Sequence, residues 1–432
     1  MIAFKRDIPI RHEVDILVAG GGPAGLAAAV TASRQGKKVF LAEGHTCFGG
    51  MGTAGLVPIF MEFTDGVNFL ADGFGKEVYE RLTESHLPNP RLIPVEFLKR
   101  IYDQLMSESG SQFSFMTQLI GVEKEADRVT FAIFSGKSGI FAVKADIFID
   151  CTGDGDLATW AGATYKKGDV QGKMMPGTLC SHWAGIDWDT ARHTRQAERL
   201  EEAFKDKIFT HEDRHHTGIN QTGRHLGGAN MSHTFGVDGT DERTITKAMI
   251  ESRKIIAEYE RYYREYLEGF ENAELVITGS LLGIRESRRI MGDYILTLDD
   301  FNKRASFDDE IGRYAYPIDI HPPSLQKDDY EKFLREFQTM RYQKGESYGI
   351  PYRSLVVKNL KNVLVAGRCI STDRYMHSSI RVMPGCFITG QAAGMAGALA
   401  VAEKNDIRHV NIHRLQTSLK KIGAYLPNAN IS

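Results

Sequence analysis

Two ionisable side chains near the end of the sequence, His377 and Arg381, are of the types that work at reacting centres. The guanidinium of an arginine can hold a substrate carboxylate or stabilise a developing oxyanion. A histidine can accept or release a proton near neutral pH. The alternative is that the two residues contact a cofactor or satisfy local backbone groups. We predict that both belong to the catalytic site.

Three arginines, Arg285, Arg288 and Arg289, form a basic cluster in the middle of the chain. If this segment is helical, Arg285 and Arg289 lie on one face and could hold an acidic substrate. The alternative is a set of structural ion pairs with Asp299, Asp300 or other acids. Arg285 is the third catalytic candidate.

Residues 211–215 read His-Glu-Asp-Arg-His and match the H-E-x-x-H pattern of zinc hydrolases. That chemistry needs a helix that places both histidines on one face, with the glutamate as base. Gly218 and Gly223 disfavour a long helix, and Gln221 stands where a metzincin has its third ligand. We therefore predict no metal site here, and expect a solvated or substrate-facing histidine cluster instead.

Composition narrows the class of protein. The formal net charge is -2, which does not favour a nucleic-acid partner. The five cysteines form no C-x-x-C pair, and the first residues lack the apolar core of a signal peptide, so a cytoplasmic enzyme is expected. The most apolar stretch, 388–402, is rich in Gly and Ala and contains Gln391, which indicates a closely packed helix and not a membrane span.

The elements that must position these side chains begin with a glycine turn, Gly20-Gly21-Gly22-Pro23-Ala24-Gly25. The turn follows the apolar run 14–19 and precedes an Ala-rich helical run. A second apolar run, 38–42, then ends in Glu43. Strand, glycine turn, helix, strand and acid together form the dinucleotide-binding fingerprint. Gly20 permits the turn, Gly22 admits a pyrophosphate, Gly25 lets the helix pack on the strand, and Glu43 can bind ribose hydroxyls.

Further along the chain, short strands are predicted between 113 and 149, joined as an antiparallel meander, and another at 146–150 leads into 151–156. A long helix is predicted between Thr240 or Asp241 and Gly269, whose apolar stripe suits core packing or a subunit contact. A buried strand at 362–366 is followed by a helix that opens near Gly390.

The chain resembles the FAD-dependent oxidoreductase family, two-domain flavoproteins of the glutathione-reductase type that are distantly similar to fumarate reductase and succinate dehydrogenase flavoproteins. The resemblance rests on the fingerprint with Glu43, the Gly49-Gly50 turn, and the segments 149–156, 283–289, 316–321, 350–355, 366–371 and 379–384.

The resemblance implies FAD as the ligand of the fingerprint. It also implies that strand-end glycines lie along the cofactor and that the helix near Gly390 points its N-terminus at the flavin. The predicted cofactor contacts are Gly20, Gly22, Pro23, Ala24, Gly25, Glu43, Gly49, Gly50, Thr152, Gly153, Asp154, Gly367, Arg368, Gly390 and Ala393.

The fold expected is α/β, with a Rossmann-like FAD-binding domain carrying an antiparallel meander (residues 1–165 and 351–432) and an inserted α+β substrate domain (166–350). The expected reaction is hydride transfer between a small organic substrate and flavin N5. The expected partners are that substrate and an unidentified electron donor or acceptor, with no nucleic acid or membrane, and a homo-oligomer is compatible with the sequence. The alternatives are a flavoprotein that acts on RNA and a zinc hydrolase.

Overall fold

The computed structural model describes residues 2, 5–193, 196–216, 218–322 and 324–429, and the chain is of mixed α/β class, as predicted. Its central sheet has the strand order β3-β2-β1-β6-β5-β4, with β15 also paired to β6. The strands are β1 (Ile10–Ala19), β2 (Val39–Ala42), β3 (Gln112–Ser114), β4 (Gln118–Glu125), β5 (Arg128–Gly136), β6 (Gly139–Asp150) and β15 (Val363–Val365).

Strand β6 divides the sheet into two parts. Its last residues pair in parallel with β15, and its first residues pair antiparallel with β5. Strands β3, β2, β1, β6 and β15 form the parallel part, and β4, β5 and the start of β6 form the meander. The parallel strands therefore end together at one edge, where an open α/β sheet binds its ligand.

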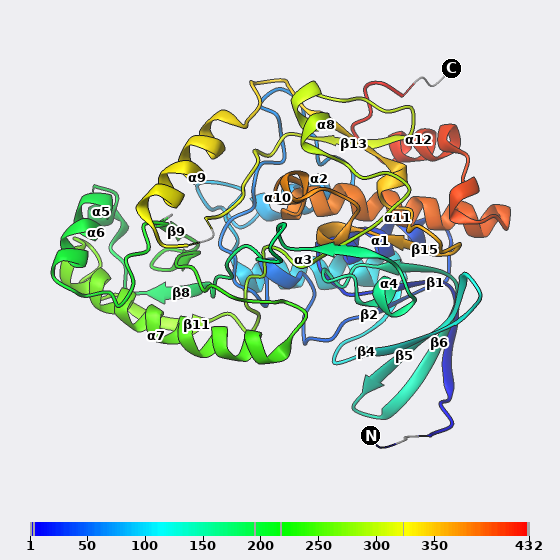
Figure 1. The fold of residues 1–432 in the computed structure, drawn as a ribbon, viewed down its shortest axis with the longest axis horizontal. Helices are drawn as coiled ribbons and strands as arrows, with labels where there is room; N and C mark the ends of the chain where they lie inside the picture. The colour runs from blue at the N-terminus through cyan, green and yellow to red at the C-terminus, as the bar shows by residue number, and fades with distance from the viewer. Residues whose placement is uncertain (1, 3–4, 194–195, 217, 323, 430–432) are drawn as a thin grey trace.

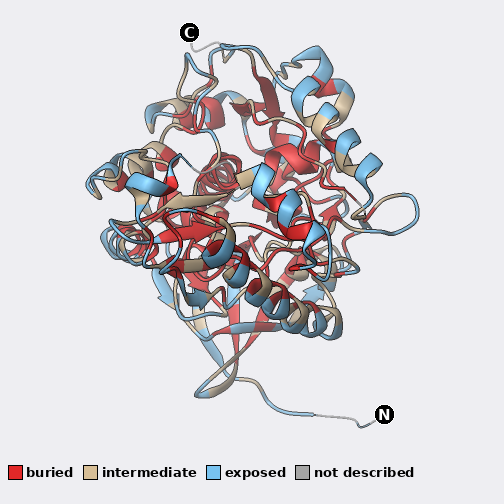
Figure 2. Cartoon of the chain, turned by 90° about the vertical axis from the view of Figure 1, so that its left-hand side faces the viewer, coloured by how far each residue is buried: buried red, intermediate tan, exposed pale blue. Residues whose placement is uncertain are grey.

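Two helices of small residues pack together on this sheet. They are α1 (Pro23–Arg34) and α11 (Met383–Glu403), side by side in Figure 1. A Cβ on Gly390 would lie 2.2 Å from the carbonyl oxygen of Ala24, and one on Gly394 would lie 2.2 Å from that of Ala28. By length and composition α11 could cross a membrane, but 89% of its most apolar window is buried inside the protein. It is the core helix of the fold, since its residues from Met383 to Ala400 are buried. Figure 2 shows that the buried parts of the chain, in red, gather in the interior of the molecule.

The remaining helices near this sheet are α2 (Phe74–Thr83), α3 (Val95–Ser109), α4 (Asp156–Trp160), α10 (Arg374–Ile380) and α12 (Ile412–Lys421). Short 3₁₀ turns occur at Gly50–Gly52, Tyr352–Ser354, Gly367–Cys369 and Ile407–His409.

A second hydrophobic cluster is formed by residues between Leu179 and Leu282. It contains an antiparallel sheet of order β11-β8-β10-β9 and the helices α5–α7, at the left of Figure 1. The elements are α5 (Trp188–Ala191), α6 (Gln196–Lys205), α7 (Glu242–Tyr266), β8 (Ser181–Ala184), β9 (Ile219–Gln221), β10 (Gly227–Ala229) and β11 (Glu274–Thr278). The long helix α7 confirms the prediction, and its N-cap is Asp241, whose side chain accepts from the backbone N–H of Arg243.

Two short strand pairs and two helices connect the clusters. Strand β7 (Tyr165–Lys167) pairs with β12 (Arg288–Ile290), and β13 (Glu310–Tyr314) pairs with β14 (Tyr348–Pro351). The helices are α8 (Leu298–Lys303) and α9 (Lys327–Thr339). Residues of β13 and β14 belong to the main hydrophobic core and not to the second cluster.

Candidate functional site

A cavity of about 640 Å³ opens at the carboxyl ends of the parallel strands. The turns that follow β1, β2, β6 and β15 form part of its wall. Another part is formed by Arg285, Asp319, His321 and Arg381, and further parts by His215, His216 and residues of α9. The cavity therefore brings together the predicted cofactor turn and two of the three predicted catalytic residues.

The glycine turn after β1 has the geometry that the fingerprint predicts. Gly20 has a φ of 96°, and a Cβ there would lie 2.5 Å from the carbonyl oxygen of Cys151. A Cβ on Gly25 would lie 1.8 Å from the carbonyl oxygen of Gly20, so the helix can approach the strand only with glycine there. A Cβ on Gly22 would meet nothing within 4 Å, because Gly22 borders the open cavity. Pro23 and Ala24 also line the cavity.

Glu43 has a structural role in addition to its predicted contact with ribose hydroxyls. Its Oε2 accepts from the backbone N–H of Gly21 at 2.6 Å, and its Oε1 accepts from that of His45 at 2.8 Å. The carboxylate thus holds the glycine turn in place while lining the cavity. Each carboxylate oxygen has further lone pairs, so contact with ribose hydroxyls is still available.

The other predicted glycine turns divide into two groups. Gly50 lines the cavity opposite Gly22, with 3.5 Å between a Cβ built on Gly50 and the Cα of Gly22. Thr152, Gly153, Asp154, Gly367 and Arg368 line it as well, and Arg368 forms an ion pair with Asp154 at 2.9 Å. Gly49 does not line the cavity: a Cβ there would lie 2.5 Å from the ring of Tyr102, so Gly49 serves packing.

The helix expected to open near Gly390 begins earlier, at Met383. Val382 and Met383 line the cavity, whereas Gly390 and Ala393 lie inside the helix, fully buried and outside the cavity wall. This corrects the assignment of Gly390 and Ala393 as cofactor contacts. Pro384 carries no N–H and suits the first turn, where that donor would be unpaired in any case.

FAD fits this cavity. The helices α1 and α11 both begin at its wall, and neither N-cap residue, Gly22 or Val382, forms a side-chain cap. Their first N–H groups and positive dipole ends thus face a space that a diphosphate and an electron-rich ring can occupy. The open approach at Gly22 admits the diphosphate, and the other cavity glycines leave room for an extended ligand.

The basic part of the wall is formed by Arg285 and Arg381. Arg285 donates to the Pro176 carbonyl and the Thr178 hydroxyl, both neutral groups. Among the described residues no carboxylate forms an ion pair with it. Burial, together with the nearby charge of Arg381, lowers the pKa of Arg285 to about 10. Arg381 donates to Asp319 Oδ2 at 3.1 Å, and its Nε has no hydrogen-bond partner in the described part of the chain.

The other two arginines of the predicted basic cluster are structural. The segment is not helical: Arg288 and Arg289 lie on strand β12. Arg288 pairs with Asp156 at 2.6 Å, and Arg289 with buried Glu286 at 2.5 Å. The partners are other acids than the two named, since Asp299 pairs with Lys303 and Asp300 caps α8. The interpretation as ion pairs is thus confirmed for Arg288 and Arg289, with different acids.

His377 does not reach the cavity. Its ring is buried on α10, and neither ring nitrogen has a hydrogen-bond partner among the described residues. Burial first, then the charges of Arg289 and Arg381, holds the pKa of His377 well below its usual range. The expectation that His377 moves a proton at the site is corrected by this placement.

The buried ring of His377 predicts a pH effect on stability. Below pH 6.5 the unfolded chain binds a proton at this histidine and the folded chain does not, so wild-type stability falls. His377→Leu lacks this loss. We expect the difference in unfolding free energy, variant minus wild type, to rise by about 1.4 kcal/mol per pH unit as the pH falls below 6.5. Urea unfolding at pH 7.5, 6.0 and 5.5 measures it, and a difference that is constant with pH contradicts the prediction.

The H-E-x-x-H segment is not a zinc-protease helix. Residues 211–215 form no helix, and His211 is exposed. His215, in contrast, is 9% exposed and lines the cavity. Its ring stacks on that of His233 with 4.5 Å between centroids and meets the edge of His321 at 4.6 Å. The hypothesis of a zinc hydrolase of this type is therefore wrong, but one histidine of the motif belongs to the cavity wall.

Four further residues of this region were not predicted as site residues: Asp213, His233, Asp319 and His321. Asp319 and His321 belong to the 316–321 segment on which the resemblance rests, so a signal was present. Burial lowers the pKa of His233 and, with the charge of Arg285 next, holds that of His321 well below its usual range. For Asp213 burial acts in the opposite direction, but the hydrogen bond from His233 prevails and lowers its pKa.

Comparison with known proteins adds a family. A model of the family described as FAD dependent oxidoreductase matches residues 15–419. Among solved structures, a geranylgeranyl bacteriochlorophyll reductase-like protein from Thermoplasma acidophilum is 14% identical, with a TM-score of 0.48 over 95% of this chain and 83% of that one. The flavin-dependent brominase Bmp2 is 12% identical, with a TM-score of 0.48 over 95% and 83%. The p-nitrophenol 4-monooxygenase PnpA from Pseudomonas putida DLL-E4 is 10% identical, with a TM-score of 0.45 over 95% and 86%. The sequence identities and TM-scores are too low to indicate the reaction of this chain.

Proposed function

The chain belongs to the FAD dependent oxidoreductase family, and we propose that this FAD-using enzyme oxidises or reduces a small organic anion by hydride transfer. Bound FAD supplies the redox chemistry, accepting or giving a hydride at N5. The task of the protein is to bind the anion, orient it and exclude water.

The observation that carries this proposal is the charge of one part of the cavity wall, which is formed by Arg285, Arg381 and Asp319. Arg285 and Arg381 both face the cavity, and only Asp319 forms an ion pair with either of them among the described residues. One buried and one largely buried guanidinium group with one carboxylate leave a positive excess in this part of the wall, which a carboxylate or similar anion from a substrate would neutralise. The lowered pKa of Arg285 is consistent with this excess, since burial and the charge of Arg381 lower it.

Asp319 orients one of these groups. It accepts from Arg381, and the hydroxyl of Tyr316 lies 3.4 Å from the same carboxylate oxygen. The hydroxyl of Ser378 accepts from the Asp319 backbone N–H at 2.9 Å. These contacts fix the guanidinium, so that little conformational freedom is lost when an anion binds. Phe333 and Phe337 of α9 form an apolar part of the wall, which limits the access of water.

We propose the predicted domain division as part of this function. Residues 1–165 and 351–432 would bind FAD, and 166–350 would contribute the inserted substrate domain, within which the second hydrophobic cluster occupies 179–282. The proposed partners are a small-molecule substrate and a separate electron donor or acceptor, without nucleic acid or membrane, in a cytoplasmic enzyme that could form a homo-oligomer.

The test is anaerobic reduction of the bound flavin by a panel of small hydroxy acids and saturated carboxylates, and reoxidation of reduced flavin by unsaturated ones. With a compound that reacts, Arg285→Gln and Arg381→Gln are each expected to lower the second-order rate constant of flavin reduction or reoxidation by about 10- to 100-fold. The reason is that one charge-assisted hydrogen bond contributes roughly 1.5–3 kcal/mol to the binding of the anion. FAD content should not change.

Arg414→Gln is the matched control, because Arg414 is an exposed arginine paired with Glu403 outside the cavity wall. Its rate constant should equal that of the wild type. Unchanged rates in both cavity variants would contradict the anion site. A panel with no reacting carboxylate would contradict the proposed substrate class.

A further inference from the structure

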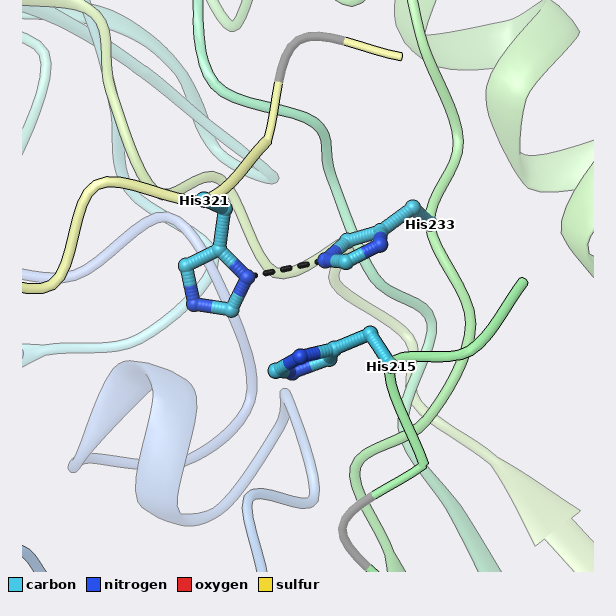
Figure 3. A group of neighbouring side chains, drawn as sticks. All are labelled: His215, His233 and His321. Atoms are coloured by element: carbon cyan, nitrogen blue, oxygen red, sulfur yellow. Dashed lines mark hydrogen bonds between the residues drawn. The ribbon is translucent and has the colours of Figure 1, made fainter. Parts of the chain in front are cut away.

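Three histidine rings from three separate segments converge beside the cavity: His215, His233 and His321 (Figure 3). One ring nitrogen of each lies within 4.8 Å of the others. His233 Nε2 and His321 Nδ1 face each other at 2.8 Å. His215 and His321 also line the cavity, so one side of the group is open to whatever enters it.

A carboxylate stands behind two of the rings. His233 Nδ1 lies 3.2 Å from Asp213 Oδ2, and His321 Nε2 lies 3.4 Å from Asp319 Oδ1. In each case the nitrogen that faces the carboxylate is the one that should carry the ring proton, because it can then donate to an anion. A neutral imidazole has only one N–H. The two nitrogens that face each other therefore both present lone pairs.

Two lone pairs at this distance repel each other, and neither of the two ways to place a proton between them is favourable. Moving the proton of either ring to the nitrogen that faces the other ring would give a hydrogen bond between them, but would turn a ring lone pair towards Asp213 or Asp319. Adding a proton between the rings would bury an imidazolium charge that the lone pair of only one other ring stabilises. A bound cation removes the conflict, since both lone pairs would then point at it.

We propose that His215, His233 and His321 bind a divalent transition-metal ion of the zinc class, with an open coordination position towards the cavity. Three neutral imidazoles with one open position are the ligand set of a catalytic zinc site. Metal-bound histidines commonly donate their other N–H to a carboxylate, as Asp213 and Asp319 are placed to accept. Ligand nitrogens about 2.0–2.1 Å from one ion are roughly 3.3 Å apart, between the 2.8 Å and 4.8 Å seen here.

The open position defines the ligand class. An ion held here would take an oxygen donor from the cavity, such as a carboxylate, carbonyl or hydroxyl oxygen, and would polarise it as a Lewis acid. This inference does not depend on the proposed reaction, because it concerns metal binding by the resting protein.

The experiment measures metal content in untagged holoenzyme. Wild type and variants are incubated with Zn²⁺, desalted, and analysed by mass spectrometry of the metal, with FAD content and thermal unfolding as controls for folding. We expect roughly one Zn²⁺ per chain in the wild type and close to none in His233→Ala. His215→Gln, at the cavity side of the group, is the second variant if His233→Ala fails to fold. His182→Ala is the matched control, a half-buried histidine on β8 outside the cavity wall, and should keep its metal.

Asp213→Asn is expected to weaken Zn²⁺ binding without abolishing it. It leaves the three ligands in place and removes the carboxylate behind His233, so Zn²⁺ affinity measured by calorimetry should fall by about 10- to 100-fold. A wild type that retains no Zn²⁺, or one that retains no more than His233→Ala and His215→Gln, would overturn the proposal and leave the histidines as a hydrogen-bonded part of the wall. Since no substrate is used, this outcome is separate from failure of the hydride-transfer proposal.

Discussion

Gly22→Ala is expected to weaken FAD binding by at least about 100-fold while leaving the apoprotein as stable as the wild type. A Cβ at this position would meet no protein atom within 4 Å, so the fold can accept it. The same Cβ would point into the space that a diphosphate must enter to reach the first N–H groups of α1. Losing two charge-assisted hydrogen bonds costs about 3 kcal/mol or more. Flavin fluorescence during FAD titration and thermal unfolding without FAD measure the two effects.

Two other glycines are the controls. Gly25→Ala places a Cβ 1.8 Å from the Gly20 carbonyl oxygen, so it should lose stability as well as FAD. Gly121→Ala on β4 would make only an ordinary contact with Ile133 at 3.6 Å and should lose neither. If Gly22→Ala binds FAD as tightly as Gly121→Ala does, the diphosphate does not lie at this turn.

Glu286→Gln is expected to lower the free energy of unfolding by about 3–5 kcal/mol. The Glu286 side chain is fully buried and accepts from Arg289, from Arg374 Nε at 3.1 Å and from the Met175 backbone N–H at 3.0 Å. The amide is similar in size but carries no charge. It would leave buried Arg289 without its carboxylate, and an uncompensated buried charge is costly. Equilibrium urea unfolding measures the change.

Glu346→Gln is the comparison for this prediction. Glu346 forms an ion pair with Arg304 on the surface, with the two side chains 33% and 46% exposed. Such a pair contributes little to the free energy of unfolding, because water and salt screen it. Equal losses of stability in Glu286→Gln and Glu346→Gln would show that burial does not decide the strength of these pairs.

Much of the cofactor region could be predicted from the sequence because its signals are local. A glycine turn between an apolar strand and an Ala-rich helix allows few conformations, and φ at Gly20 and the packing of Gly25 agree with it. Helix α7 was predictable for the same reason, from its repeat and the cap at Asp241. The start of α11 could have been found from Pro384, a residue that suits a first helical turn.

The proposed substrate region could not be predicted from the sequence in the same way. Whether Arg289 is on a helix or a strand depends on its pairing with β7, more than a hundred residues earlier in the chain. His377 is of the right type for chemistry, but its direction is set by the packing of α10, which buries it. No local sequence pattern indicates that Arg289 pairs with β7 or that the packing of α10 buries His377.

The sequence by itself determined the family-type cofactor turn, the α/β class and the long helix, since each follows from neighbouring residues and short-range geometry. Only the tertiary structure decided which charged groups share the cavity. His215, His233 and His321 lie far apart in the chain, and the H-E-x-x-H spacing pointed to the wrong partner for His215. Their meeting depends on how the segment between β13 and α9, which carries His321, lies against the segments that carry His215 and His233. Burial and the neighbouring charged groups then decide the protonation of each side chain.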